Sequence, residues 1–207
     1  MSTSPALTLY LVDDDEAIRR SLLLLLFPQG LPLQGFDSGE AFVQALGPQQ
    51  PGCVILDLRL GGMNGLAVLE QLRQRRSPLV VLFLSGHGDI PMALEAMRLG
   101  AFDWVVKPDT ARLLEKLPAA LAEASARAEA LQRWQELTPR EREVARQVGL
   151  GLPNKEIARR LDPPCSPRSV ETHRAHLFAK LGLGNDNELG RWLQRQAWLV
   201  ADGEAGA

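Results

Sequence analysis

Short apolar runs alternate with amphipathic segments over the first half of the chain. Runs such as VILDL and LVVLFLS are apolar on both faces of a strand, which is typical of parallel strands that helices cover on either side. Between these runs, apolar residues recur at helical spacing. The pattern predicts strands at residues 7–12, 31–36, 53–57, 79–85 and 102–106. It predicts helices between them, at residues 16–27, 39–46, 65–75 and 91–99.

The strict alternation of strands and helices indicates one fold class. It is that of an α/β, doubly wound, flavodoxin-like sheet of five parallel strands, because each connecting helix must return over one face of the sheet. Open sheets of this kind bind their ligands outside the carboxyl ends of the strands. We therefore expect the functional site at the ends of the first, third, fourth and fifth strands.

The second half of the chain shows only helical patterns. Apolar residues recur every three or four positions and form a stripe along one predicted helix. The favoured interpretation is that this last helix packs on its own sheet and then becomes a linker. A dimer seam is the alternative, and Pro118 predicts a kink within the helix. The stripe consists of Leu114, Leu117, Leu121, Ala124, Ala128 and Leu131.

Four further helices are predicted to form a small all-α domain. Thr138 and Glu141 make a capping box with Pro139 at the first helical position, so a helix begins there and ends near Gly149. The other helices are predicted at residues 154–161, at 167–182 and from 185 onward. The expected domains are residues 1–120, a helical linker at 121–136, the helical domain at 137–200 and a disordered tail at 201–207.

Composition indicates the cellular location and the partners to expect. The longest apolar run, Leu22 to Phe27, is far too short to cross a bilayer, and the N-terminus lacks the pattern of a signal peptide. We therefore expect a cytoplasmic protein with no membrane partner. Cys53 and Cys165 are expected to be reduced bystanders. Residues 139–183 carry 9 Lys and Arg against 5 Asp and Glu, which weakly favours nucleic acid as a partner.

Polar residues gather at the predicted strand ends. Asp13 and Asp14 follow the first strand, while Asp57, Ser85 and Lys107 end the third, fourth and fifth strands. Three crowded carboxylates repel one another unless a cation lies among them, and oxygen ligands suit Mg²⁺. A lysine and a serine on the far side can bind a phosphoryl group, with Asp57 as the nucleophile. Each residue alone could be a cap, a turn or a surface charge, but their joint placement favours phosphoryl-transfer chemistry.

Three segments carry a family resemblance: VDDDEAIRRSL, VILDLRLGGMNGLAVLEQL and LSGHGDIPMALEAMRLGAFDWVVKP. They resemble the receiver domain of two-component response regulators, close to the NarL/FixJ class. The resemblance implies that Asp57 accepts phosphate from a sensor histidine kinase and that Ser85 and Lys107 bind the phosphoryl oxygens. The implied ligands of Mg²⁺ are Asp13, Asp14, Asp57 and the backbone carbonyl of Arg59.

The resemblance also implies a switch. Trp104 lies where the family places its switch aromatic residue, and it is predicted to act together with Ser85. Lys107-Pro108 is a candidate cis peptide bond. Asp109 stands where the family commonly has phenylalanine, so the usual face of the fourth helix, fifth strand and fifth helix is expected to differ. Arg59 and His87 flank the site, either as modulators of phosphate loss or as loop residues without a kinetic role.

A second resemblance covers the helical domain. LTPREREVARQVGLGLPNKEIARRL and SVETHRAHLFAKLGL are similar to the LuxR-type helix-turn-helix. Val170, Leu177 and Leu181 share one face of its third helix and are expected in the core, and His173 is expected to be structural. The opposite arc, which would enter a major groove, consists of Glu171, Thr172, Ala175, His176 and Ala179.

The resemblance assigns the DNA contacts by side-chain type. Base readout is expected from Glu171, Thr172 and His176. Phosphate contacts are expected from Lys155, Arg168, Arg174 and Lys180, and a solvated surface charge is the alternative for each. The turn before the third helix, LDPPCSPRS, is longer than the usual turn of the family. Its two prolines are expected to stiffen it and to alter the angle of the recognition helix.

The two modules together predict a transcription regulator. Phosphorylation of Asp57 is expected to favour a homodimer that binds promoter DNA, and RNA polymerase is a further candidate partner. Beyond self-phosphorylation and autodephosphorylation, no enzymatic activity is expected. One alternative is a phosphatase, which calls for a second acid where this chain has Arg59. The other is a constitutive dimerisation module that no longer accepts phosphate, against which the complete acidic site argues.

Overall fold

The computed structural model describes residues 6–47, 49–86 and 90–200. Its first part contains a sheet of five parallel strands in the order β2-β1-β3-β4-β5, which confirms the doubly wound fold predicted above. The strands are β1 (Thr8–Val12), β2 (Leu33–Phe36), β3 (Gly52–Leu56), β4 (Val80–Ser85) and β5 (Asp103–Val106). The connecting helices are α1 (Glu16–Leu26) with the 3-10 turn η1 (Phe27–Gln29), α2 (Gly39–Ala45), α3 (Gly65–Gln74) and α4 (Ile90–Arg98).

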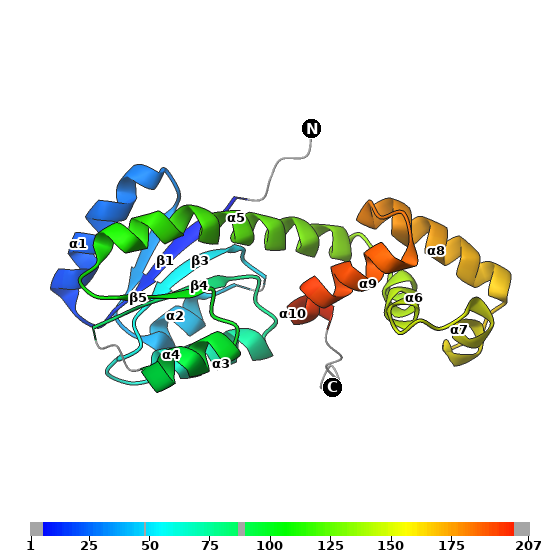
Figure 1. The fold of residues 1–207 in the computed structure, drawn as a ribbon, viewed down its shortest axis with the longest axis horizontal. Helices are drawn as coiled ribbons and strands as arrows, with labels where there is room; N and C mark the ends of the chain where they lie inside the picture. Colours follow the sequence, from blue (N-terminus) through cyan, green and yellow to red (C-terminus); the bar gives the residue numbers. More distant parts are fainter. Residues whose placement is uncertain (1–5, 48, 87–89, 201–207) are drawn as a thin grey trace. The chain divides into compact units, whose positions relative to one another are not determined.

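Two apolar cores lie on the two faces of the sheet. Helix α1 covers one face together with α5 (Thr110–Gln135), and Leu26 and Leu117 pack there (Figure 1). Helices α2, α3 and α4 cover the other face, where Phe42 and Val68 are fully buried. Every residue of β3 and β4 is buried, because helices cover both faces. This double burial explains why the two strands are apolar throughout.

Helix α5 is a single helix of 26 residues. It runs through Pro118 without a break, and the proline side chain is exposed. Leu117 and Ala124 of the apolar stripe are buried in the core of the sheet, whereas Leu131 is buried in the core of the helical part. The stripe therefore packs on its own sheet first and continues into the next unit, as the docking interpretation requires.

The chain divides into two compact units, residues 1–128 and residues 129–207. The division falls inside α5, so the segment predicted as a linker is part of one continuous helix. No helix among the described residues combines the length and the apolar character needed to span a membrane.

The second unit is all-helical, as predicted. It contains α6 (Pro139–Gly149), α7 (Asn154–Arg160), α8 (Pro167–Leu181), α9 (Asp186–Arg195) and the short α10 (Ala197–Val200), of which only α10 was not predicted. The capping box is present: Thr138 Oγ1 accepts from the N–H of Glu141 at 3.2 Å, and Glu141 Oε2 accepts from the N–H of Thr138 at 2.8 Å. Val170, Leu177 and Leu181 are fully buried in its core, which confirms the predicted core face of α8.

Candidate functional site

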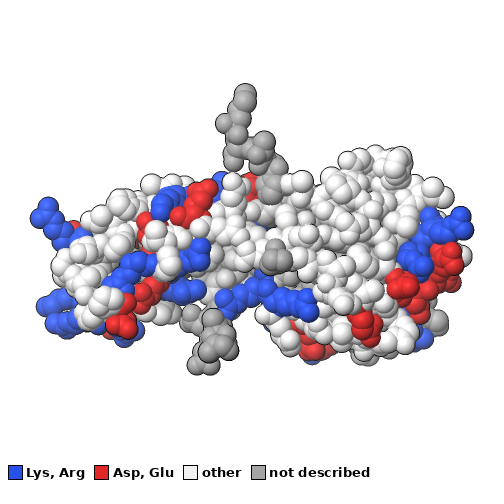
Figure 2. Space-filling model, turned by 180° about the vertical axis from the view of Figure 1, so that it is seen from behind, with Lys and Arg blue, Asp and Glu red and all other residues white. Residues whose placement is uncertain are grey.

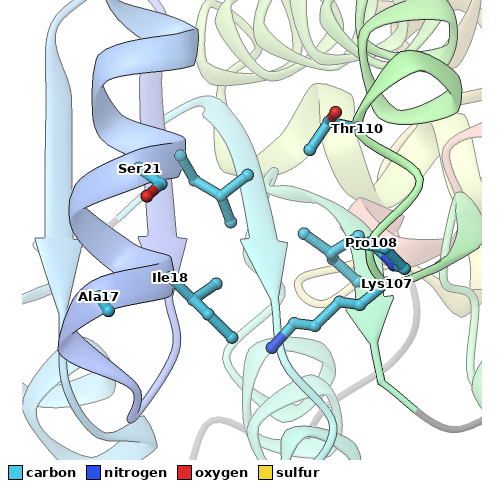
Figure 3. Close-up of a pocket in the computed structure, with 8 residues that line it drawn as sticks. Ala17, Ile18, Ser21, Lys107, Pro108 and Thr110 are labelled. Atoms are coloured by element: carbon cyan, nitrogen blue, oxygen red, sulfur yellow. The ribbon is translucent and has the colours of Figure 1, made fainter.

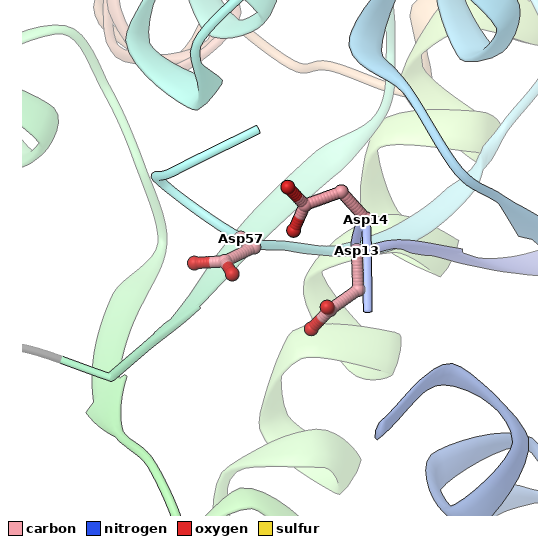
Figure 4. A group of neighbouring side chains, drawn as sticks. All are labelled: Asp13, Asp14 and Asp57. Carbon is pink, nitrogen blue, oxygen red and sulfur yellow. The ribbon is translucent and has the colours of Figure 1, made fainter. Parts of the chain in front are cut away.

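The strand ends bring the predicted acidic residues together. Asp13 follows β1 and Asp57 follows β3, and these strands are neighbours in the sheet. The N–H of Asp57 donates to the carbonyl of Val12 at 2.8 Å, which holds the two aspartates side by side. Asp14 is exposed on the loop after β1 and completes the group. Carboxylate oxygens of Asp13, Asp14 and Asp57 lie within 4.8 Å of one another (Figure 4).

Lys107, directly after β5, reaches into this acidic group. Its Nζ lies 2.6 Å from Asp13 Oδ2 and 2.7 Å from Asp57 Oδ2. Burial raises the pKa of the Asp13 carboxyl, although the lysine partly opposes this shift. Burial alone would lower the pKa of Lys107, but its hydrogen bonds to the two aspartates and their charge raise that pKa overall. The lysine therefore stays charged and offsets part of the repulsion between the carboxylates.

The donor set fits a hard divalent cation. Carboxylate oxygens are the ligands that Mg²⁺ prefers, and three carboxylates meet here. Asp15 is not available to this group, because its side chain accepts from the N–H groups of Ala17 and Ile18 and caps α1. Arg59 lies on the loop directly after Asp57, and its N–H donates to Asp57 Oδ1 at 3.3 Å. Its carbonyl is thus carried by a loop that starts at the site.

Ser85 ends β4 on the same rim of the sheet. Its side chain is 1% exposed, and its Oγ has no hydrogen-bond partner among the described residues. A buried hydroxyl without a partner is unfavourable unless a ligand satisfies it. Trp104 on β5 is half-buried, and its ring stacks on Phe83 of β4 with a centroid distance of 5.3 Å. Lys107-Pro108 is cis, as the resemblance implied, and His87 lies outside the described residues.

An apolar pocket of about 310 Å³ adjoins the acidic group (Figure 3). Ile18, Ser21 and Leu22 line it from α1, and Pro108 and Thr110 line it from the segment that follows β5. The stem of Lys107 forms part of the wall, so the pocket lies beside the residue whose ammonium pairs with Asp57. A partner that reaches Asp57 from this side meets an apolar surface next to a charged one.

Helix α8 presents the predicted arc to solvent. Glu171, Thr172, Ala175, His176 and Ala179 are all exposed. Lys155 and Arg168, two of the predicted phosphate contacts, are exposed as well. His173 is half-buried, which agrees with a structural role. On the face of this unit that Figure 2 shows, Lys and Arg side chains lie among Asp and Glu side chains.

The other two predicted phosphate contacts are engaged within the protein. Lys180 Nζ donates to Glu141 Oε2 at 2.7 Å, and the Glu141 side chain is 4% exposed. His176 Nδ1 lies 3.8 Å from the other oxygen of the same carboxylate. The Arg174 guanidinium forms an ion pair with Asp186 at the start of α9. These pairs join different helices, and the sequence carries no local signal for them.

The turn between α7 and α8 is held by an arginine from α6. Arg140 donates to the carbonyl of Asp162 at 3.0 Å and also to the carbonyl of Pro163. The N–H of Cys165 donates to the carbonyl of Ala158 at 3.0 Å, and this cysteine is partly exposed. Asp162-Pro163 is cis. The turn is therefore anchored to α6 and to α7.

Comparison with known proteins decides the family. Residues 9–118 match the response regulator receiver domain, and residues 135–193 match the bacterial regulatory proteins of the luxR family. The chain belongs to the response regulators of the NarL/FixJ class. It is 39% identical to the transcriptional regulatory protein FixJ of Bradyrhizobium diazoefficiens, over 92% of this chain and 96% of FixJ.

Other relatives agree with this assignment. The tetrathionate response regulatory protein TtrR of Salmonella typhimurium is 38% identical over 92% of this chain and 93% of its own. The crystal structure of full-length FixJ from B. japonicum matches with a TM-score of 0.55 and 36% identity, over 94% of this chain and 99% of that chain. The protein is thus a transcriptional response regulator of a two-component system, built from a receiver domain and a LuxR-type DNA-binding domain.

The receiver domain of this response regulator contains two site-supporting residues that the sequence analysis missed. Glu40 on α2 accepts from the N–H of Met63 at 2.6 Å and so holds the loop between β3 and α3. Gly65 opens α3, where an added Cβ would lie 2.4 Å from the carbonyl oxygen of Asp57. Only glycine fits this approach without a shift of the backbone that carries Asp57. Glu40 lies in the first turn of its helix, where an acid is expected for helix stability alone.

Proposed function

We propose that this response regulator accepts a phosphoryl group on Asp57 from a sensor histidine kinase and thereby controls its own binding to promoter DNA. The observation that carries the proposal is the environment of Asp57. Its carboxylate is held 2.7 Å from the Lys107 ammonium and close to two further carboxylates. Ser85 lies buried on the same rim, and its hydroxyl has no partner among the residues that the structure describes. Nucleophile, cation and hydroxyl donor are therefore assembled before any phosphoryl group arrives.

The chemistry is an in-line displacement at phosphorus. A carboxylate oxygen of Asp57 attacks the phosphorus of a phosphohistidine, and a P–O bond forms as the P–N bond breaks. The electron pair of the broken bond returns to the departing imidazole, and Asp57 becomes an acyl phosphate. Such transfers depend mainly on positioning and on neutralisation of charge. Asp13, Asp14, Asp57 and the carbonyl of Arg59 would hold Mg²⁺, which supplies positive charge beside the phosphoryl oxygens when bound.

Lys107 and Ser85 bind the product. Before phosphorylation, Asp13 and Asp57 share the ammonium of Lys107. After phosphorylation, this ammonium turns toward one phosphoryl oxygen, and the Ser85 hydroxyl donates to another. Because Ser85 ends β4, its movement is transmitted to the neighbouring β5, where Trp104 pairs with Phe83 of β4. Phosphorylation then shifts an existing equilibrium between two receiver conformations. The favoured conformation dimerises and pairs two DNA-binding domains on promoter half-sites.

Helix α8 is the recognition helix of this proposal. Its exposed arc offers Glu171, Thr172 and His176 to base edges, while Lys155 and Arg168 are placed for the phosphate backbone. A regulator that binds bacterial promoters works in the cytoplasm, where RNA polymerase is a further candidate partner. We assign the apolar pocket beside Lys107 to the encounter with the kinase, because Lys107 joins the wall of this pocket to Asp57.

Intact-mass spectrometry after incubation with acetyl phosphate and Mg²⁺ tests the phosphoacceptor. The wild-type protein should gain about 80 Da, the mass of one phosphoryl group on a carboxylate. Asp57→Ala should show no adduct. Asp37→Ala is the matched control, because Asp37 is an exposed aspartate directly after β2 on the same rim of the sheet, and it should be phosphorylated like the wild type. An adduct on Asp57→Ala would contradict the assignment.

Switching is tested separately. Light scattering and gel shift on promoter DNA should show a larger particle and tighter DNA binding after acetyl phosphate treatment of the wild type. Asp57→Ala should remain unchanged under the same treatment. A wild-type protein that gains phosphate but keeps its oligomeric state and its DNA affinity would overturn the proposed control, while leaving the phosphoacceptor in place.

A further inference from the structure

The cation of Arg174 on the recognition helix is already paired. Its guanidinium forms an ion pair with Asp186, the first residue of α9. The same guanidinium lies over the ring of Phe178, 5.8 Å from its centroid. The side chain of Arg174 is 20% exposed and that of Asp186 is 56% exposed. Asp186 thus occupies the outer, solvent-facing side of the pair, from which a DNA phosphate would approach.

We propose that Asp186 competes with a DNA phosphate for Arg174 and so holds down the affinity of this protein for DNA of any sequence. This inference rests on the proposed DNA binding by α8. Arginine binds carboxylate and phosphate with the same planar fork of donors, so Asp186 and a phosphate are alternative partners. The negative charge of Asp186 offsets the positive charge of Arg174, so the pair adds little net positive charge to the surface that binds DNA. The part of the DNA affinity that depends only on the charge of the phosphates is therefore lower than it would be with Arg174 alone.

The exposure of the pair makes the exchange feasible. Ion pairs between exposed side chains are weak in water, so Asp186 can be displaced when a phosphate is near. The Lys180 pair is different, because Glu141 is 4% exposed and its carboxylate also accepts from the N–H of Thr138. Removing Lys180 from that carboxylate would leave a buried charge without its cation. We therefore assign the competition to Arg174 and leave Lys180 in a structural role.

The fold keeps Asp186 in place. Helix α8 ends at Leu181, and Gly182 follows as its cap with a φ of 69°, which reverses the chain. Asn185 then caps α9. Asp186 lies in the first turn of α9, where the helix dipole favours a negative charge. The carboxylate is therefore positioned by the connection between two helices rather than by a flexible loop.

Salt-dependent binding of a random-sequence DNA duplex tests the inference. The full-length protein is titrated by fluorescence anisotropy at several NaCl concentrations, with and without acetyl phosphate and Mg²⁺. We expect Asp186→Asn to bind about two- to fivefold more tightly, from the usual strength of exposed ion pairs. We expect its plot of log affinity against log salt to be steeper by about 0.9 for each DNA-binding domain, because Arg174 then neutralises one further phosphate.

Two further variants make the test specific. Arg174→Gln should bind more weakly than wild type, and adding Asp186→Asn to it should bring no gain, because the cation under competition is gone. Glu129→Gln, which removes one exposed carboxylate from α5 in the same unit, should leave the affinity near that of wild type. Asp186→Ser serves as a second neutral variant if circular dichroism shows that Asp186→Asn loses helix.

Three results would overturn the inference. They are an unchanged affinity of both neutral variants at position 186, a gain that persists without Arg174, and an equal gain in Glu129→Gln. A wild-type protein that binds no DNA at low salt, with or without acetyl phosphate, would instead contradict the proposed DNA binding itself. The failure of the inference and the failure of the proposed function are therefore distinguishable.

Discussion

Lys107 Nζ lies 2.7 Å from Asp57 Oδ2, although the two residues are 50 positions apart in the chain. The cation that we propose to bind the phosphoryl group thus already contacts Asp57. In this state it neutralises carboxylates that are almost fully buried. In the proposed mechanism phosphorylation gives the lysine a new partner, and the energetic consequences of losing its present partners can be measured.

Substitution of Lys107 should destabilise the receiver domain. Lys107→Met leaves Asp13 and Asp57, whose side chains are 2% and 9% exposed, without their cation. Removing one partner from a buried ion pair typically costs about 3–5 kcal/mol, so we expect a loss of about 3 kcal/mol in the free energy of unfolding. Urea denaturation at pH 7 measures it. Added Mg²⁺ should restore most of the loss, because it replaces the missing positive charge.

The matched control is Lys116→Met. Lys116 pairs with Asp103 at 2.8 Å, but the two side chains are 33% and 27% exposed. Partly exposed pairs contribute little, so this variant should lose less than about 1 kcal/mol. Equal losses for the two lysines would show that the buried position of Lys107 has no special energetic role.

Ser85→Ala should separate stability from switching. The hydroxyl is buried and unpartnered among the described residues, so its removal should leave the free energy of unfolding unchanged or raise it by about 1 kcal/mol. The variant should still gain phosphate on Asp57, because Ser85 is not the nucleophile. Its dimerisation after acetyl phosphate treatment should be weakened, since the phosphoryl group lacks one donor. A strongly destabilised Ser85→Ala would indicate that the hydroxyl already has a partner in the resting protein.

Pro118→Ala should stabilise α5. Pro118 lies inside this helix and is exposed, so alanine restores a backbone donor without disturbing the core. Proline in a helix interior is about 3 kcal/mol less favourable than alanine, and we expect a gain of about 2 kcal/mol, seen as a higher melting temperature. Pro28→Ala is the control, because Pro28 is the second residue of η1, in the first turn where proline is tolerated, and its effect should be small.

Glu141 should make the DNA-binding domain sensitive to acid. Burial alone would raise the pKa of its carboxyl, but the hydrogen bonds from Lys180 and Thr138 lower it below the ordinary value of 4.5. A lowered pKa in the folded state means that the stabilisation is present above pH 4.5 and is lost as the pH falls through the folded-state pKa. Glu141→Gln should cost about 1–3 kcal/mol at pH 7, and its difference from wild type should shrink on acidification.

The control for this experiment is Glu143→Gln on the same helix. Glu143 pairs with Arg140, but its side chain is 36% exposed, so the loss at pH 7 should stay below about 1 kcal/mol. Thermal melts of the full-length chain from about pH 7 down to about pH 2.5, a range that extends below the folded-state pKa of Glu141, would give both comparisons. A difference between Glu141→Gln and wild type that does not change with pH would rule out titration of Glu141 as its cause.

The receiver fold and its site could be predicted from the sequence because they follow from periodicity and topology. Apolar runs identify the strands, and parallel strands place their carboxyl ends on one rim, which is enough to bring Asp13, Asp57 and Lys107 together. The contact of Lys107 with both aspartates was not predicted, because the pattern does not say which partner a cation takes before phosphate arrives. Glu40 was missed because its place in a first helical turn already has an ordinary explanation.

In the helical domain, the helices could be predicted from the sequence, but the ion pairs between them could not. Capping residues and apolar spacing gave α6 to α9, including the buried face of α8. The pairs of Lys180 with Glu141 and of Arg174 with Asp186 escaped prediction, because each joins two helices whose packing is not encoded in any local pattern. The surface assignments at Lys155, Arg168, Glu171, Thr172 and His176 remain predictions.

The Arg174–Asp186 pair has a consequence for how such a regulator evolves. Codons for aspartate and asparagine differ only in their first base, so one point mutation removes the negative charge at position 186. That change leaves the exposed arc of α8 untouched. The strength with which the protein holds DNA can therefore drift independently of the sequence it prefers, and a gene copy could acquire a broader set of target promoters in one step.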